Sequence, residues 1–213
     1  EFRRVLFRSS YSIGDIIVKN LVIMSSRQNI DLTGSFMSFS MYESIFTPGI
    51  ILDIDVLDTT DVLGSSVLIG DESVLLTAMV PNGQMFNLVF HLDSLADLQS
   101  QGAQKSKTYT LKCVSIEAFF GMRNPVRTGY KNVLCSDIIK DLHTNYVKSF
   151  KPIDIEPSDG IVGPLAIPNF PAFKAIRMIR EMAVSSTNKS SIFSYFETRE
   201  SGIQAFKFVT IES

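Results

Sequence analysis

The sequence predicts a mostly β protein of the α+β class. Two observations support this prediction. Segments rich in β-branched and aromatic residues, separated by turn signals, follow one another up to about residue 118. Beyond that point, the apolar residues of two segments follow helical spacing. We therefore expect a β unit at 11–118 and an α+β unit at 119–213, because 213 residues suit one large domain or two small ones.

The strands expected in the first unit are 15–24, 35–42, 50–57, 73–80, 85–92 and 108–118. In the strand at 50–57, Asp53 and Asp55 alternate with Ile54 and Val56, so the two pairs lie on opposite faces. Asn82-Gly83 joins two apolar runs and indicates a hairpin turn. We expect one helical turn at 59–63 with Asp58 as its N-cap, and a polar loop at 94–107.

The second unit begins with an irregular stretch at 119–131 and contains two predicted helices. The first covers 137–147, with Ser136 as its N-cap and an apolar face of Ile138, Ile139, Leu142 and Tyr146. The second runs from Pro171 to about 185, and its apolar face is Phe173, Ile176, Ile179 and Ala183. Extended segments at 152–157 and 160–167 and a closing hairpin of 191–197 with 203–211 complete the unit. We expect Phe173 and Ile176 to be buried and to anchor the second helix.

Charge and hydropathy exclude two classes of protein. The net charge is −2 and no basic stripe is present, which argues against a protein that holds nucleic acid by its phosphates. The longest apolar runs, such as 74–80, are too short for a membrane helix. A mean hydropathy of +0.18 is high for a soluble monomer, so part of the surface is expected to be buried against partners.

The densest acidic cluster is Asp53, Asp55, Asp58 and Asp61. It lacks the glycine and the final glutamate of a calcium-binding loop, so we interpret it as a solvated strand face and a helix cap. Glu197, Arg199 and Glu200 are expected to form exposed ion pairs at a hairpin tip.

Cysteines and histidines offer no reactive arrangement. Cys113 and Cys135 are far apart and have no CxxC partner, so both are expected to be free, buried thiols. His91 lies in a predicted strand and His143 on the polar side of a predicted helix, without a neighbour at metal-ligand spacing. The chain has no Walker loop, GxGxxG, GxSxG or HExxH motif. We therefore predict no enzyme, and no catalytic, cofactor-binding or metal-binding residues.

Both ends of the chain are unusual. Glu1–Ser10 reads EFRRVLFRSS, and Glu-Phe is encoded by a common restriction site, so we interpret the stretch as a non-native scar. The predicted strand at 203–211 runs almost to Ser213, which suggests a fragment of a longer chain.

Tyr42 to Glu72 carries an ordered series of motifs. Tyr42-Glu43 precedes Ile45-Phe46, then come a Pro-Gly turn, a strand with Asp53, an aspartate-containing turn at 58–63 and a step from Gly70 to Glu72. This order resembles the amino-terminal part of baseplate hub proteins of contractile-tailed, T-even type bacteriophages. It is more distantly similar to the hub region of type VI secretion spike proteins. TYTLKCVSIEAF, SDIIKDLHTNYV, IPNFPAFKAIRMIREMA and SIFSYFETRESGIQAFKF extend the resemblance over about 16–208.

The resemblance implies a tube-like antiparallel β-barrel at 11–118, then a partial barrel-like domain with two helices at 119–213, which would be incomplete. It also implies a homotrimeric virion protein, assembled in the host cytoplasm, that joins the sixfold tail tube to the threefold cell-puncturing spike. The implied partners are a spike protein of the tail-lysozyme type, the tail tube and other baseplate proteins. DNA would pass through the channel without specific binding, and the chain would need no cofactor and would not insert into a membrane.

Two other functions remain open. One is a monomeric β-rich binding module of unknown ligand, marked by an exposed aromatic patch. The other is a tail-associated hydrolase, for which Glu43, Asp53 and Glu72 are the available, poorly suited carboxylates.

Overall fold

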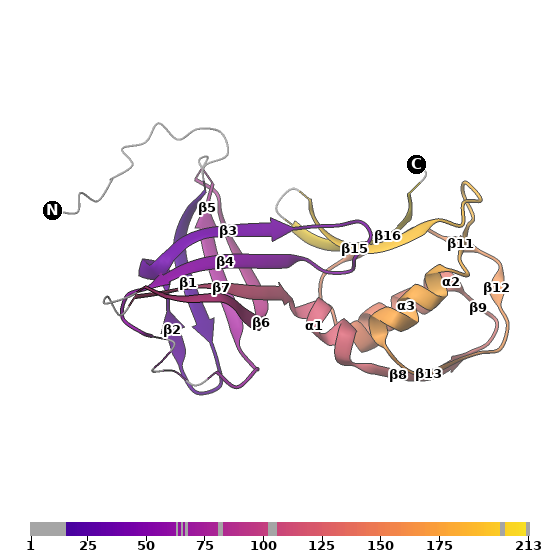
Figure 1. Cartoon of the computed structure of the whole chain (residues 1–213). Helices are drawn as coiled ribbons and strands as arrows, with labels where there is room; N and C mark the ends of the chain where they lie inside the picture. The colour runs from indigo at the N-terminus through magenta and orange to yellow at the C-terminus, as the bar shows by residue number, and fades with distance from the viewer. Residues whose placement is uncertain are drawn as a thin grey trace.

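A computed structural model of the chain describes residues 16–62, 64, 66, 68–80, 83–101, 106–200 and 203–211. The proposed scar at Glu1–Ser10 and the tips of the two predicted hairpins, at 81–82 and 201–202, lie outside the described residues. Figure 1 shows a curled sheet at one end of the molecule and a helical part at the other, with the β15–β16 hairpin extending between them.

The first part is one seven-stranded antiparallel sheet in the order β2-β1-β5-β6-β7-β4-β3. Its strands are β1 (Ile17–Met24), β2 (Asn29–Asp31), β3 (Phe36–Tyr42), β4 (Ile51–Asp58), β5 (Ser73–Met79), β6 (Met85–Gln101) and β7 (Ser106–Ser115). The edge strands β2 and β3 are joined by only the short stretch 32–35, so the sheet curls back on itself. No strand pairing among the described residues joins β2 to β3. The sheet is therefore curled and open, whereas a barrel was expected.

The concave face of this sheet encloses the first core. Leu52, Ile54 and Val56 of β4 are fully buried, while Asp53 and Asp55 point away from the core, as the alternation predicted. The same alternation places Leu111 and Cys113 of β7 in the core. The mostly β, α+β class predicted from the sequence is confirmed.

The described residues of the second part form three α-helices and a further core. The helices are α1 (Ile116–Arg123), α2 (Cys135–Leu142), extended by the π-helical turn His143–Val147, and α3 (Ala172–Arg180). The antiparallel strand pairs are β8 (Pro125–Tyr130) with β13 (Leu165–Pro171), β9 (Val133–Leu134) with β12 (Ile161–Val162) and β11 (Ser158–Asp159) with β14 (Val184–Ser185). A small sheet in the order β10-β16-β15 contains β10 (Ile153–Ile155), β16 (Ile203–Thr210) and β15 (Phe193–Glu200).

The structure corrects several local predictions. Helix α1 occupies a stretch interpreted as the end of a strand and an irregular segment, and β6 continues to Gln101 through the expected loop at 94–107. The described residues at 59–62 form bends and a turn, because the Asp58 carboxylate accepts a bond from the Thr60 amide (3.0 Å) and begins an Asx-type turn. Ser136 lies inside α2, whose N-cap is Leu134, and its amide donates to the Ser158 hydroxyl (2.9 Å).

Helix α3 has the predicted apolar face but ends at Arg180, short of the expected end near 185, where β14 begins at Val184. Ala172, Ala175, Ile176 and Ile179 are buried, and Pro171 is the N-cap. Ile176 is buried as predicted, whereas Phe173 is only partly buried. The Phe173 ring packs against Gly121 of α1 and meets the Tyr195 ring of β15 in an edge-to-face arrangement at 6.1 Å between ring centroids. Phe173 therefore joins three elements at the margin of the second core.

Candidate functional site

A buried charged cluster lies where the two parts of the molecule meet. Lys151 extends its ammonium group to the carboxylate of Glu117 (2.7 Å) and to that of Glu197. The Glu197 side chain is fully buried, and those of Glu117 and Lys151 are 11% and 18% exposed. Breaking such a pair from one side leaves a buried charge without a partner, so the cluster is expected to be held firmly. We call these three residues the junction cluster.

The junction cluster also holds the beginning of β4. The second carboxylate oxygen of Glu197 accepts a bond from the Ile50 amide (3.3 Å), and the Ser115 hydroxyl lies at the same distance from that amide. A backbone N–H group that donates to a buried carboxylate satisfies the oxygen that takes no part in the ion pair. Strand β15 is thereby attached to the first sheet.

The loop 43–49, between β3 and β4, is fixed to β15 at further points. The Glu43 carboxylate accepts bonds from the Thr198 hydroxyl (3.3 Å) and the Arg199 amide (3.4 Å). The Ser194 hydroxyl donates to the Ile45 carbonyl. The Arg199 guanidinium lies over the Phe86 ring of β6, 4.2 Å from the ring centroid, which is within the range of a cation–π contact. The loop therefore presents Phe46 in a defined position.

The interpretation of Glu197 and Arg199 as exposed hairpin residues is wrong. Phe193, Tyr195 and Glu197 alternate along β15, so all three point toward the interior. Burial lowers the pKa of the Arg199 guanidinium, and the nearby Glu43 carboxylate acts in the opposite direction by raising it. The alternation of Phe193, Tyr195 and Glu197 in the sequence could have predicted that Glu197 is buried. Nothing near Lys151 in the sequence indicates that it pairs with Glu197.

His143 is also buried, contrary to the prediction of a polar helix face. Its Nδ1 lies 2.8 Å from the Tyr195 hydroxyl, and its ring packs edge-on against Phe206 at 4.9 Å between centroids. Burial lowers the pKa of His143, so the neutral form is favoured in the folded protein. Its role in this structure is to satisfy the Tyr195 hydroxyl within the second core.

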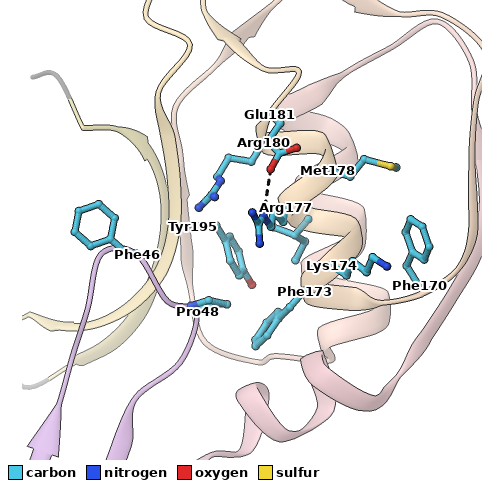
Figure 2. Close-up of a pocket in the computed structure, with 11 residues that line it drawn as sticks. Phe46, Pro48, Phe170, Phe173, Lys174, Arg177, Met178, Arg180, Glu181 and Tyr195 are labelled. Carbon is cyan, nitrogen blue, oxygen red and sulfur yellow. Dashed lines mark hydrogen bonds and ion pairs between the residues drawn. The ribbon is translucent and has the colours of Figure 1, made fainter.

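A surface groove of about 840 Å³ runs beside α3, between this helix and the 43–49 loop. Figure 2 shows Phe46 and Pro48 on the loop side, Tyr195 and Phe173 at the floor, and the guanidinium groups of Arg177 and Arg180 on the same side of the helix. Arg177 pairs with Glu181 (3.2 Å). On the other side of α3, the Lys174 ammonium lies 4.1 Å from the centroid of the Phe170 ring. The groove therefore combines an aromatic lining with basic side chains.

Phe46 is the unusual member of this groove. This residue is 71% exposed, although Glu43 and Ile45 of the same loop bond to β15. An exposed aromatic side chain at the rim of an apolar groove is typical of an interaction surface. We refer to this region, with Phe46, Phe173, Arg177 and Arg180 as its defining residues, as the α3 groove.

The acidic residues considered from the sequence have separate partners. Asp53 pairs with Lys112 (2.7 Å), Asp55 accepts bonds from the Ser38 and Thr110 hydroxyls, and Asp61 pairs with Lys107 (2.6 Å). The bonds from Ser38 and Thr110 lower the pKa of Asp55. Asp58, expected as the cap of a helical turn, is fully buried and accepts from the Thr60 amide in an Asx-type turn instead. Among the described residues, no group of His, Cys, Asp and Glu is arranged to hold a metal ion.

The carboxylates considered for hydrolysis are likewise engaged in different places. Glu43 binds β15, Asp53 binds Lys112, and Glu72 accepts bonds from the Ile69 and Gly70 amides (2.5 and 2.8 Å). Glu72 is buried and holds the turn before β5. In the described part of the chain, no hydrogen bond or ion pair joins any two of these three carboxylates.

Both cysteines are free and buried, as predicted. Burial raises the pKa of Cys113 to about 12, and it raises the pKa of Cys135 as well. Both thiols are therefore protonated and unreactive in the folded protein at neutral pH. Within the described part of the chain, no helix has the length and apolar character needed to cross a bilayer.

Comparison with known proteins gives matches of structure alone. No family model and no curated protein matches the sequence. The 43 kDa tail protein of prophage MuSo2 from Shewanella oneidensis is similar at a TM-score of 0.54 and 7% identity, over 92% of this chain and 55% of that one. The tail protein from Neisseria meningitidis MC58 gives 0.51 and 13%, over 89% of this chain and 49% of that one.

The third similar structure comes from a secretion machine. It is the E. coli c3393 protein, described as a type VI secretion component with structural similarity to the T4 bacteriophage tail proteins gp27 and gp5. Its TM-score is 0.56 at 8% identity, over 91% of this chain and 48% of that one. This chain has the fold of phage tail proteins. The resemblance inferred from the sequence is thus confirmed at the level of the fold, over a chain that spans about half the length of these neighbours.

Proposed function

We propose that this chain is a structural subunit of the central hub of a tail baseplate, where a homotrimer joins the sixfold tail tube to the threefold spike. The observation that carries the proposal is the fold, which is shared over about nine-tenths of the chain with two tail proteins and a type VI secretion component. Fold alone does not determine function, so the sequence motifs from Tyr42 to Glu72 supply a second line of support.

The proposal includes the arrangement of the chain and its partners. The unit at 11–118 would be the first tube domain, and 119–213 the opening part of the second. The partners would be the spike protein, the tail tube and other baseplate proteins, and the location would be the virion tail. A net charge of −2 suits a channel that DNA crosses without being held, because a cationic wall would bind phosphate.

We also propose that the chain is not an enzyme. This is supported by the separate structural roles of Glu43, Asp53 and Glu72, since hydrolysis of a glycosidic bond needs two carboxyl groups facing one bond. A cell-wall turnover assay with the purified chain tests this point. Release of soluble wall fragments above the buffer control would contradict it and would favour the hydrolase.

The hub proposal is tested by locating the chain in tails and by measuring its mass. Purified particles from the source cells, labelled with an antibody against the chain, should carry label at the baseplate end of the tail. Native mass spectrometry should give a species of three times the 23.7 kDa of the chain. Absence of the chain from tail particles would overturn the hub role and would favour the monomeric binding module.

A further inference from the structure

The second half of β6 forms a projecting, acidic and apolar surface. Strand β5 begins opposite His91, so β6 beyond Leu92 pairs with β7 alone. The pairing is interrupted between Ala96 and Gln99, where Asp97 has a φ of 53°. A bulge of this kind re-aims side chains, and a positive φ at a residue other than glycine is uncommon.

The bulge places leucines in solvent between carboxylates. Leu98 is 67% exposed and Leu95 is 42% exposed, and Asp93 and Asp97 are exposed beside them. Exposed leucines at a strand edge favour association with another surface, because their burial removes apolar area from water. We call residues 93–98 the β6 ridge.

The α3 groove has the complementary composition. Its exposed aromatic side chain is Phe46, and its floor includes the partly buried Phe173. Arg180 forms no ion pair with any residue in the described part of the chain, and Arg177 pairs only with the exposed Glu181. The groove therefore offers an apolar surface and unbalanced positive charge, whereas the β6 ridge offers leucines and negative charge.

The ridge and the groove of one folded chain occupy separate places, since none of the residues 93–98 lines the groove. Strand β7 runs from the ridge directly into α1, and Leu111, which pairs with Leu95 of the ridge, lies about 13 Å before Ser115 at about 3.3 Å per residue. The groove lies between α3 and the 43–49 loop, and Figure 1 shows α3 on the far side of α1 from the first sheet. An occupant with the chemistry of the ridge must therefore come from another molecule.

We propose that the β6 ridge of one copy docks into the α3 groove of a second copy. Leu98 would pack against Phe46 and Phe173, and Asp93 and Asp97 would face Arg177 and Arg180. The contact uses two different surfaces, so it is heterologous, and a rotation of a third of a turn closes it into a ring of three. This inference rests on the proposed homotrimeric hub and assigns the surfaces that hold it together.

The first test measures how variants of the full chain associate. Leu98→Asp and Phe46→Asp should each raise the concentration at half-association at least tenfold in native mass spectrometry and analytical ultracentrifugation. The matched control is Ile161→Asp, because Ile161 is also 67% exposed but lies in β12, outside both surfaces. Circular dichroism of all three variants should show unchanged folding, since each position is exposed.

The second test mixes a copy that lacks the ridge with a copy that lacks the groove. A mixture of Leu98→Asp and Phe46→Asp chains retains one intact ridge and one intact groove for each pair of chains. The intact ridge of one variant should fill the intact groove of the other, so the mixture should form a mixed dimer and no trimer. A contact between two identical surfaces would not give such a mixed dimer.

The outcomes separate this inference from the hub proposal. Trimers of normal strength in both variants would overturn the ridge-to-groove contact and leave the homotrimer in place. A wild-type chain that is monomeric at every concentration, yet present in tails, would overturn the contact between copies and would assign the groove to an acidic segment of another tail protein. Absence from tails would overturn the hub proposal itself.

Discussion

At the scale of single residues, the junction cluster places two carboxylates around one ammonium group. The excess negative charge is offset by hydrogen bonds, since Glu197 accepts from the Ile50 amide and Glu117 accepts from the Ser149 hydroxyl (3.2 Å). A buried ion pair contributes little net stability compared with apolar residues of the same shape. Removal of one partner is nevertheless strongly destabilising, because the other charge stays buried without a partner. The value of Lys151 therefore lies in fixing how β15, α1 and β4 meet.

Replacement of Lys151 by Met leaves Glu117 and Glu197 buried beside each other without a cation. We expect a loss of about 3–5 kcal/mol in the free energy of unfolding, measured by urea denaturation at pH 7. Lys189→Met is the control, because the Lys189–Asp159 pair is well exposed to solvent and its loss should change stability little. Equal stability of the two variants would show that the junction cluster is not held as described.

His143 should make stability depend on pH near neutrality. Burial lowers its pKa in the folded state, so the unfolded chain binds more protons just below the ordinary value of about 6.5. The contribution of His143 is fully present above pH 6.5 and decreases as pH falls toward 5. The pKa of His91 is also lowered in the folded state. The contribution of His143 is therefore isolated by comparing the wild type with a variant changed at His143 alone.

The variant is His143→Gln, which keeps a polar group near the Tyr195 hydroxyl but does not titrate. The free energy of unfolding of the wild type should fall more steeply between pH 7.5 and 5 than that of the variant. Carboxylates with lowered pKa, such as Asp55, lose their contribution only below about pH 4 and do not disturb this range. Parallel slopes would mean that His143 takes up a proton in the folded state as readily as in the unfolded one.

At the scale of elements, alternation identified most strands but could not identify two features that position the candidate surfaces. Helix α1 has no single apolar face, because it contacts both cores, with Ala118 against Gly49 and Gly121 against Phe173. The extension of β6 is polar and bulged, so its pairing with β7 is visible only in three dimensions. The α3 groove was partly predictable from the apolar face of α3, whereas Phe46 beside it depends on the fold.

The contact between α1 and α3 can be tested at Gly121. A Cβ atom added there would lie 2.3 Å from the Phe173 ring, so Gly121→Ala must displace that ring. We expect a loss of about 1–3 kcal/mol in the free energy of unfolding, as for other overpacked contacts. In the double variant Gly121→Ala with Phe173→Ala, the added methyl group should cost much less, which a double-mutant cycle measures. Additive losses would show that the two residues do not meet.

At the scale of the whole molecule, two cores are linked by contacts that involve backbone as well as side chains. The first core contains Cys113 and the second contains Cys135. The Ile50–Glu197, Ile45–Ser194 and Phe86–Arg199 contacts join the curled sheet to β15, which belongs to the second core. Since β15 is shared in this way, we expect the two cores to unfold together.

The two buried cysteines provide a separate probe for each core. Both thiols are protected in the folded state, and a pulse of iodoacetamide at increasing urea labels each one only when its core opens. In the wild type the labelling midpoints of Cys113 and Cys135, measured by peptide mass spectrometry, should coincide, which is the sign of one cooperative transition. In Lys151→Met the two midpoints should separate, because the junction cluster no longer joins the cores. Separate midpoints in the wild type would show instead that the junction positions the α3 groove without coupling the two folding units.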